Sequence, residues 1–387
     1  MTAIKEWAYR NLKGDSLIWS IVLLLSIFSI LVVYSATGSL AYKYVGGNTE
    51  YYLMKHGALV LLSLFAMWLV HRIDYRYYSK VSKLLLYVSA VLLVVTWQFG
   101  SNINEASRWL SIPIINQAFQ PSDLAKLALI VTLANMLAKR QHNIADFQKA
   151  IVPMLIWIGV ICGLIAMTNI SSALMLFGTC MVVLFIGRVP VKFIAMLIFI
   201  GGISGILAIS FGQRGGTAKS RIESYFGDEI PYQAQQAYAA IATGGLFGKG
   251  PGQSDQRNFL PSAYSDFIYA IIIEEYGLIG GLSVLMLYLG LLYRGMKATT
   301  NSDTAYGGLL ASGLVFSIIF QAMINIGVTL GVGPITGVTL PLLSMGGTSQ
   351  LFFGIALGMI LSVTQGQLEG DTLGNRNQTK KPQFNAL

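Results

Sequence analysis

The run SDFIYAIIIEE, residues 265–275, begins an apolar segment that continues to about residue 293. A helix of this length crosses the hydrocarbon core of a bilayer, which is about 30 Å thick. Three carboxylates, those of Asp266, Glu274 and Glu275, lie on the opening turns of the segment. Ionisable side chains are costly in a membrane, so these acids indicate either a function or buried partners.

The rest of the chain is also strongly apolar. Of its 387 residues, 54% are hydrophobic and 11% are charged, and the mean hydropathy is +0.62. This composition excludes a soluble globular protein and predicts an all-α integral membrane protein with a single polytopic domain over residues 1–387. Ten apolar runs predict ten spans, near residues 17–35, 56–70, 83–98, 122–138, 151–167, 173–187, 191–211, 267–293, 306–329 and 349–364.

The positions of the basic residues predict the orientation in the membrane. Most of the 26 Lys and Arg residues lie before the first span, in the loops after the second, fourth, sixth and eighth spans, or in the tail. Cytoplasmic segments are enriched in Lys and Arg, so both termini are expected in the cytoplasm. The first span lacks a small-residue cleavage site and is expected to remain as an anchor. A basic inner face against anionic lipid explains the net charge of +9 without a nucleic-acid partner.

Polar residues are concentrated in three outer segments, 100–121, 212–264 and 330–348. The second of these belongs to a large structured loop, 212–265, between the seventh and eighth spans, with a predicted helix over residues 232–242. The third contains two prolines and many glycines, which is typical of a re-entrant loop that lines a cavity. The tail, residues 365–387, is polar and is expected to be disordered in the cytoplasm.

The glycine-rich run GGLFGKGPG, residues 244–252, matches neither common nucleotide motif. A P-loop requires Ser or Thr after its lysine, but Gly250 follows Lys249, and a dinucleotide fingerprint should follow a strand. The run is therefore interpreted as a flexible loop whose backbone can approach a ligand and whose lysine can meet an anion. The Cys and His residues lack metal-ligand spacing, so a metal site built from them is excluded; they are Cys162, Cys180, His56, His71 and His142.

Several outer residues are candidates for an anion site. Four cations of the outer segments can converge on a phosphate: Arg108, Arg214, Arg221 and Lys249. Arg108 beside Trp109 is equally consistent with an interfacial pair. In the run QPSD, residues 120–123, either Ser122 or Asp123 can cap the fourth span, and Pro121 suits its first turn.

The three acids of the opening run have different alternatives. By position alone, Asp266 is more consistent with a helix cap than with catalysis. Glu274 and Glu275 lie too deep for capping, so they require a water-filled cavity or internal partners such as Lys126 or backbone donors. A structural ion pair is the favoured role for at least one of them.

These motifs, taken in order, resemble the SEDS family of peptidoglycan polymerases, which comprises FtsW, RodA and SpoVE. The resemblance covers nearly the whole chain, and residues 13–36 are most similar to the cell-division branch, FtsW. The chain departs from the family pattern at three places. Residues 168–171 read TNIS instead of Pro-Asp-Leu-Gly, and Asp123 and Met345 stand where the family has other residues. The motifs that carry the resemblance are residues 108–109, 120–122, 244–252, 265–268, 274–277, 325–327, 334–337 and 344–347.

The resemblance implies a peptidoglycan glycosyltransferase that polymerises lipid II at the outer face of the bacterial cytoplasmic membrane during cell division. Asp266 would be the general base on the acceptor sugar hydroxyl, with undecaprenyl pyrophosphate as the leaving group. Glu274 and Glu275 would be supporting residues. The residues expected to bind substrate are Arg108, Gln120, Ser122, Lys126, Arg214, Arg221, Lys249 and Ser344.

The expected partners are lipid II, a class B penicillin-binding protein transpeptidase, other divisome proteins and membrane lipids. A divalent cation, Mg²⁺ or Mn²⁺, is expected, although no recognisable motif binds it. Two alternatives stay open: a lipid II flippase or other transporter, and a non-catalytic division scaffold. A transporter would place its key acids near the membrane midplane, and Glu274 and Glu275 are the candidates for that position.

Overall fold

Ten apolar helices form the body of the protein, as the sequence predicts. The computed structural model describes residues 11–44, 46–103, 106–112, 117–211, 215–227 and 230–378; for residues 101–103, 106–108, 111–112, 117–118, 211 and 366–378 only the backbone is described. The ten helices are α2 (Ser16–Ala36), α4 (Thr49–Val70), α5 (Tyr75–Phe99), α6 (Pro121–Lys139), α7 (Val152–Thr168), α8 (Ile170–Ile186), α9 (Val191–Phe211), α12 (Ile268–Thr300), α13 (Ala305–Thr329) and α14 (Ser349–Gln378). The predicted all-α multi-pass membrane fold is confirmed.

Within the described part of the chain, eight of these helices are long and apolar enough to cross a membrane, when α7 is taken together with the turn that precedes it, as Phe147–Thr168. The two shorter apolar helices are α8 and the first part of α14, residues 349–365. The backbone of α14 continues as a helix to Gln378. The expected disorder of residues 365–387 stays a prediction.

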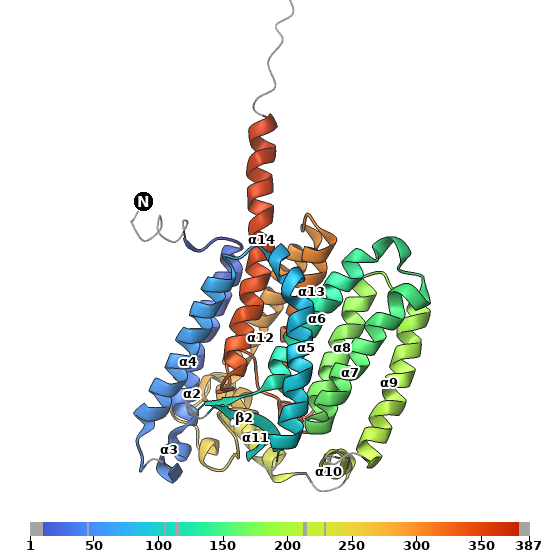
Figure 1. Cartoon of the computed structure of the whole chain (residues 1–387). Helices are drawn as coiled ribbons and strands as arrows, with labels where there is room; N and C mark the ends of the chain where they lie inside the picture. The colour runs from blue at the N-terminus through green and yellow to red at the C-terminus, as the bar shows by residue number, and fades with distance from the viewer. Residues whose placement is uncertain are drawn as a thin grey trace, which may run out of the picture.

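The two ends of the bundle differ in what they carry. The described N-terminal residues and the C-terminal part of α14 lie at one end, here called the termini end (Figure 1). The opposite end, here called the loop end, carries α3 (Gly38–Tyr44), α10 (Gly215–Phe226) and α11 (Tyr232–Gly244). This arrangement agrees with an even number of crossings and with a large loop between α9 and α12. The helix predicted over residues 232–242 is confirmed as α11.

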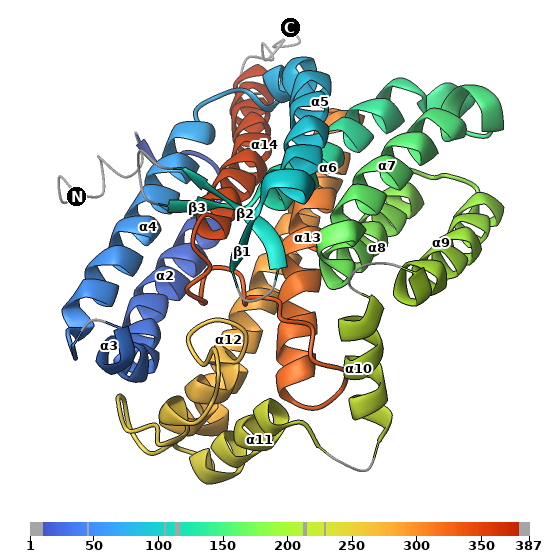
Figure 2. The same cartoon turned by 60° about the horizontal axis from the view of Figure 1, so that its bottom comes forward.

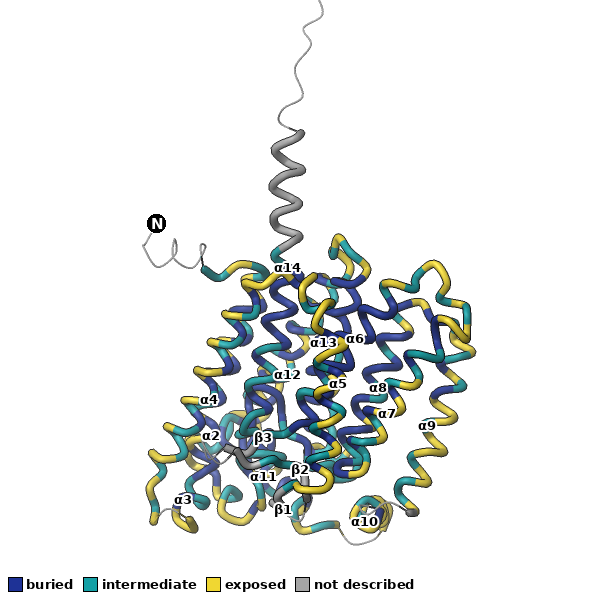
Figure 3. Tube along the Cα trace, in the orientation of Figure 1, coloured by how far each residue is buried: buried dark blue, intermediate teal, exposed yellow. Residues whose placement is uncertain are grey.

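The core lies around α6 and α13. Of the most apolar stretch of each helix, 83% is buried in α6 and 72% in α13, but only 11% in α9. Figure 3 shows the same contrast, with α6 largely dark blue and α9 largely yellow. The helix α9 is therefore a peripheral span whose apolar side chains face lipid.

Helices α4 and α14 pack with their backbones in close contact. A Cβ atom on Gly354 would lie 2.3 Å from the carbonyl oxygen of Ser63, and one on Gly358 would lie 2.7 Å from that of Met67. The Ser63 hydroxyl also donates a hydrogen bond of 2.7 Å to the carbonyl oxygen of Gln350. Small residues allow membrane helices to approach in this way.

A short antiparallel sheet at the loop end was not predicted. Its strands are β1 (Ser101–Ile103), β2 (Ala106–Ile112) and β3 (Gln117–Phe119), in the order β1-β2-β3 (Figure 2). Strands of three to seven residues give too little alternation to be recognised in a sequence. Short helical turns complete the connections: η1 (Gln141–Asn143), η2 (Phe147–Ile151) and η3 (Gln256–Asn258).

Candidate active site

Asp266 lies at the loop end, two residues before α12 begins. The residue at the N-cap of α12 is Phe267, and no side chain caps this helix. The interpretation of Asp266 as a helix cap is therefore wrong. The half-buried carboxylate instead accepts a hydrogen bond of 2.9 Å from the Ser265 hydroxyl at its Oδ1 atom.

Two buried polar side chains hold the backbone around Asp266. Asn325 of α13 is 1% exposed, and its Nδ2 group donates to the carbonyl oxygens of Asp266 and Val338, both at 2.7 Å. The Ser344 hydroxyl donates to the carbonyl oxygen of Ser265 at 2.6 Å. These bonds tie the approach to α12 to the re-entrant segment 330–348. The described bonds of Ser344, expected to bind substrate, thus serve the backbone.

Arg221 of α10 and Asp266 lie against the same glycine. A Cβ atom on Gly337 would be 3.5 Å from Asp266 Oδ2 and 3.8 Å from each terminal nitrogen of the Arg221 guanidinium. Gly337 has a φ of +67°, a conformation that favours glycine. The absence of a side chain here lets both charged groups approach the segment. Asp266 and the cation Arg221 thus lie against one residue of the segment 330–348.

The Tyr264 hydroxyl is close enough to Asp266 for the charge of this carboxylate to affect it. Burial raises the pKa of Tyr264, and the nearby Asp266 carboxylate raises it further. Tyr264 therefore stays a neutral hydrogen-bonding group beside Asp266 at physiological pH.

A mainly apolar cavity of about 290 Å³ adjoins Arg221. Its walls come from the junction of α7 and α8, from α10 and α13, and from residues 334–336. The prediction that the segment 330–348 lines a cavity is confirmed. An apolar space with a guanidinium among its lining groups suits an amphiphile that has a hydrocarbon chain and an anionic head. Lining residues include Asn169, Leu174, Arg221, Phe320, Ile324 and Ile335.

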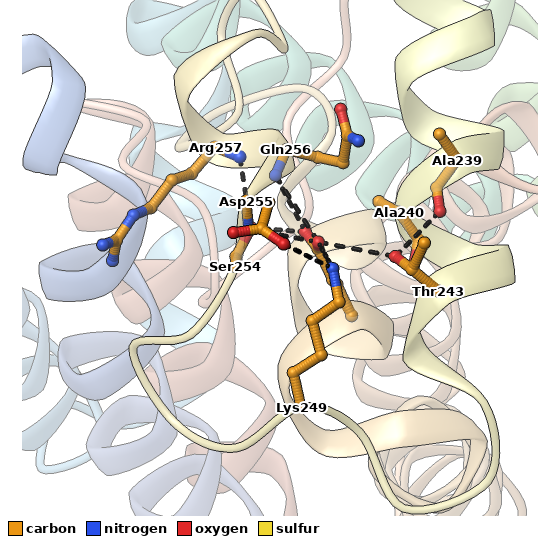
Figure 4. Close-up of polar contacts among 9 residues, drawn as sticks. Ala239, Ala240, Thr243, Lys249, Ser254, Asp255, Gln256 and Arg257 are labelled. Carbon is orange, nitrogen blue, oxygen red and sulfur yellow. Dashed lines mark hydrogen bonds and ion pairs between the residues drawn. The ribbon is translucent and has the colours of Figure 1, made fainter.

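Glu274 is the centre of a second polar cluster, and its partners Lys249, Ser254, Asp255 and Gln256 are labelled in Figure 4. Its carboxylate is 0% exposed and accepts bonds from Lys249 Nζ at 2.7 Å and from the Asp255 backbone N–H at 3.1 Å. The Ser254 hydroxyl and the Gln256 backbone N–H also donate to it. These bonds fasten residues 249–256 to α12.

The ion pair expected for one of the glutamates is confirmed, and so are backbone donors to Glu274, but Lys126, the cation named as an example, is not the partner. Glu274 pairs with Lys249, not with Lys126, and Lys249 also pairs with Asp255 at 2.9 Å. The hydrogen bond that Lys249 donates to the Glu274 carboxylate is the main cause that raises the pKa of Lys249, so its ammonium stays charged. Lys249 is thus held by two carboxylates. Its predicted contact with substrate stays a prediction.

The helix α12 is broken at Gly277, and the glycine-rich loop fills the break. Gly277 has φ 69° and ψ −173°, which no helix contains. The Leu278 N–H donates to the Gly245 carbonyl oxygen at 3.0 Å, and the Lys249 N–H donates to the Glu274 carbonyl oxygen at 2.9 Å. A Cβ atom on Gly248 would lie 2.3 Å from the Glu275 carbonyl oxygen. The glycines of this run therefore let the loop backbone dock on α12, a role not predicted.

Glu275, the neighbour of Glu274 and also before the break, is bonded to α2. It is 1% exposed, and the Ser35 hydroxyl donates to its Oε1 atom. Arg257 in turn donates to Ser35, to its carbonyl oxygen at 3.3 Å and to its hydroxyl at 3.2 Å. These contacts agree with the supporting role expected for Glu275.

The start of α6 differs from the prediction. Pro121 occupies the first turn as expected, but the N-cap is Gln120 and no side chain caps the helix, so capping by Ser122 or Asp123 is wrong. Gln120 donates to the Ser122 hydroxyl at 2.8 Å. Lys126 pairs with Asp123 at 3.0 Å, and both side chains are largely buried. This pair links α6 to α14, because the Ser349 hydroxyl donates to Asp123.

Arg108 and Arg214, the other two outer cations predicted to bind an anion, have side chains that the structure does not describe. For Arg214 the backbone is not described either. Among the described residues, no group of three His, Cys, Asp or Glu side chains is placed to hold a metal ion.

Asn325, Gly337 and Tyr264 are site residues to which the sequence assigned no role. Asn325 and Gly337 stand in quoted motifs, and a polar Asn inside an apolar span was the available signal. Nothing in the sequence indicated that they would meet Asp266, because these contacts join segments separated by about 60 to 70 residues.

Replacing Glu274 with Gln is expected to loosen the loop that it fastens. The variant loses the charge that attracts Lys249 and the backbone N–H groups, at a cost of roughly 2–4 kcal/mol. Amide hydrogen exchange over residues 244–257 should accelerate roughly 30- to 1,000-fold at this cost.

The matched control is Asp255→Asn, because the Asp255 side chain is 76% exposed and its pairing with Lys249 is worth less than about 1 kcal/mol. Equal exchange rates in the Glu274→Gln variant and the unaltered protein would show that the carboxylate does not hold the loop.

Comparison with known proteins places this geometry in context. A family model described as a cell cycle protein, FtsW/RodA/SpoVE, matches residues 15–368. Stage V sporulation protein E of Bacillus subtilis (strain 168) is 35% identical over 92% of this chain and 98% of its own. The probable peptidoglycan glycosyltransferase FtsW of Haemophilus influenzae is 32% identical over 92% of this chain and 93% of its own.

Two solved structures share the fold over 92% of this chain. One is a chain from work on structural coordination of polymerization and crosslinking by a peptidoglycan synthase complex, with a TM-score of 0.71, 24% identity and 98% of that chain covered. The other is a substituted form of the rod shape determining protein RodA from Thermus thermophilus, with a TM-score of 0.67, 25% identity and 98% coverage. The likeness therefore extends over the whole helical bundle.

Proposed function

The chain belongs to the FtsW/RodA/SpoVE family of cell cycle proteins, and we propose on this basis that it is a peptidoglycan glycosyltransferase. It polymerises lipid II into glycan strands during cell division, at the outer face of the bacterial cytoplasmic membrane. The observation that carries the proposal is the meeting of the half-buried Asp266 carboxylate and the Arg221 guanidinium over Gly337, beside an apolar cavity.

The orientation follows from charge and from the position of the site. The loops expected in the cytoplasm are rich in Lys and Arg, and the described N-terminal residues lie at the termini end of the bundle. The loop end, with Asp266, then faces outward. Lipid II presents its sugars on that side, which favours a polymerase with an outer carboxylate.

The reaction transfers a glycosyl group from a pyrophosphate to a hydroxyl. The acceptor oxygen forms a bond to the anomeric carbon of the donor, while the bond from that carbon to the pyrophosphate oxygen breaks. Asp266 accepts the proton of the acceptor hydroxyl, and Arg221 faces the negative charge that develops on the leaving pyrophosphate. The apolar cavity would hold the first part of the polyprenyl chain and so position the donor.

A divalent cation, Mg²⁺ or Mn²⁺, fits this site only as an ion shared with the substrate. Mg²⁺ is commonly held by one or two carboxylates together with substrate phosphates. Asp266 is the described carboxylate beside Arg221, and no group of three metal-ligating side chains occurs in the described part of the chain. The ion would neutralise charge on the departing pyrophosphate.

A class B penicillin-binding protein is the proposed partner. A structural neighbour belongs to a peptidoglycan synthase complex that coordinates polymerization with crosslinking. Division of labour between a polymerase and a transpeptidase explains why a chain of this kind would act in such a complex. Other divisome proteins complete the proposed assembly.

The alternative of a lipid II flippase finds less support. Its candidate acids were Glu274 and Glu275, but Glu274 is paired with Lys249 and Glu275 is bonded to Ser35. A transport couple must exchange its ligand with water on both sides. Two acids engaged in fastening a loop and two helices are poorly suited to that exchange.

The test is reconstitution of the purified protein with its transpeptidase partner in liposomes that contain fluorescent lipid II. Glycan polymer should appear on gels when both proteins are present. It should be absent when the transpeptidase partner is reconstituted without this chain. Movement of labelled lipid II between leaflets without any polymer would favour the flippase. Neither activity would favour the scaffold.

Replacing Arg221 with Gln should lower kcat/KM for lipid II by a factor on the order of 10 to 100. The variant loses a cation that faces the leaving group, and a loss of this size corresponds to about 1.4–2.7 kcal/mol of transition-state stabilisation. Steady-state polymerisation rates over a range of lipid II concentrations measure the loss.

The matched control for this change is Lys219→Gln on the same helix. Lys219 pairs only with Glu223 in the described interactions, at 3.7 Å, and is 69% exposed. A change in its kinetics as large as that of Arg221→Gln would indicate a general effect of charge on α10 instead of a specific contact.

A further inference from the structure

A second cavity lies between α5, α6 and α7 at the termini end of the bundle, whereas Asp266 lies at the loop end. Its volume is about 400 Å³, larger than that of the cavity beside Arg221. It begins where α6 ends and where α5 and α7 begin, so it lies at the level of a lipid headgroup if the bundle spans a bilayer (Figure 1). Nothing in the proposed reaction uses it.

Three cations and no carboxylate line this cavity. The cations are Lys83, Lys139 and Arg140, and within the described interactions none of them forms a salt bridge. Arg140 uses its Nε group to donate to the carbonyl oxygen of Lys149 at 3.0 Å, which fixes the guanidinium at the rim. Three like charges around one cavity repel one another, and an anion between them removes that repulsion.

The lining of the cavity about one helical turn deeper than these cations is apolar and aromatic. It includes Leu86, Met136 and Trp157, and the rings of Trp157 and Tyr87 meet edge to face with centroids 5.0 Å apart. Trp and Tyr are enriched at the level of lipid headgroups in membrane proteins. Asn135 stiffens the wall, because its Nδ2 group donates to the Ser79 carbonyl oxygen at 2.9 Å. The cavity thus combines a cationic rim with a hydrocarbon-compatible wall.

We propose that this cavity binds the phosphodiester headgroup of an anionic phospholipid from the leaflet on the termini side. The cations would meet the phosphate oxygens, and the aromatic wall would contact the glycerol and the upper acyl chain. Basic pockets between spans are a recurrent type of anionic-lipid site, whereas a free phosphate would make no use of the apolar wall. The inference is independent of the glycosyltransferase assignment.

The test measures retention of phosphatidylglycerol by native mass spectrometry of the detergent-solubilised full chain. The unaltered protein should bind phosphatidylglycerol more tightly than phosphatidylcholine. The variant Lys83→Gln/Lys139→Gln/Arg140→Gln should bind it on the order of 100-fold more weakly, since each basic side chain contributes roughly five-fold near an anionic lipid.

The control variant, Arg76→Gln/Lys80→Gln/Lys192→Gln, also removes one Arg and two Lys at the termini end but none that lines the cavity. It should retain binding within about threefold of the unaltered protein. Equal losses in both variants, or no preference for phosphatidylglycerol, would overturn the proposal. Displacement of the lipid by millimolar inorganic phosphate would overturn the assignment to a lipid.

A variant-independent measurement guards against misfolding of the triple substitution. Phosphatidylglycerol with a photoreactive acyl chain should label α5, α6 or α7 of the unaltered protein next to Trp157, as mapped by peptide mass spectrometry. Labelling confined to other spans would contradict the proposed site.

Discussion

Replacing Asp266 with Asn is expected to abolish detectable polymerisation of lipid II, with a rate loss on the order of 10² to 10⁴. The amide of Asn accepts no proton at neutral pH, but it is almost isosteric with the carboxylate and can still accept the bond from Ser265. The surrounding backbone is held by Asn325 and Ser344, which do not depend on the charge of Asp266. The fold should therefore survive the substitution.

The measurement compares polymer yield per molecule in reconstituted liposomes with thermal unfolding of the same preparations. Asp255→Asn serves as the matched control, since it removes one negative charge from an exposed side chain 11 residues before Asp266. Its polymerisation should stay within about twofold of the unaltered protein, as expected for an exposed ion pair. Normal polymer formation by Asp266→Asn would refute its role as the base.

Replacing Gly277 with Ala is expected to destabilise the protein by roughly 3 kcal/mol or more. The φ and ψ angles of Gly277, 69° and −173°, lie in a region that is nearly exclusive to glycine. A Cβ atom there would also lie 2.2 Å from the Leu246 carbonyl oxygen, so the docked loop would have to move. The midpoint of thermal unfolding in detergent should fall sharply, and activity should fall with it.

Gly290→Ala provides the control on the same helix. A Cβ atom on Gly290 would meet only the Ile21 side chain, at 3.4 Å, and alanine favours a helix over glycine by up to about 1 kcal/mol. This variant should be as stable as the unaltered protein or slightly more so. Similar melting curves for the two alanine variants would show that the break in α12 does not require glycine.

Asp266 and the break at Gly277 lie at the two ends of one short helical segment. Residues 268–276 of α12 are fixed at their start by Asn325 and Ser344, through the residues that precede the helix, and at their end by the loop around Glu274. Asp266 is thus positioned from two sides, by Asn325 and Ser344 before the helix and by the bonds of Lys249 to Glu274 within it. This arrangement is consistent with a carboxylate that must be held accurately at the edge of a membrane.

The sequence predicted the helices well because their signal is local. The fourth span, predicted over 122–138, is α6 from Pro121 to Lys139, and the seventh, predicted over 191–211, is α9 from Val191 to Phe211. Apolar runs of this length have few alternative interpretations. The end of α12 was less certain: the helix reaches Thr300, beyond the predicted residue 293, because Arg294 and Lys297 interrupt the apolar pattern without breaking the helix.

The partners of the site residues could not be predicted, because they join distant segments. Glu274 was expected to require a partner, and the need was real, but the partner was Lys249 and not Lys126. Hydropathy and spacing do not reveal which loop returns to which helix. Gly277 was equally hidden, since a glycine in an apolar run is usually accommodated within a continuous membrane helix.

The contact between α4 and α14 has a consequence for biogenesis. The helix α4 is translated early, whereas α14 is the last of the ten, and the face of α4 around Ser63 and Met67 fits the bare backbone of Gly354 and Gly358. During synthesis that face of α4 remains without its α14 partner, in the bilayer or beside the insertion machinery, until α14 has been made. Ribosome-stalled chains that end before residue 349 should therefore remain incompletely assembled, and completion of the bundle becomes a step that requires the synthesis of α14.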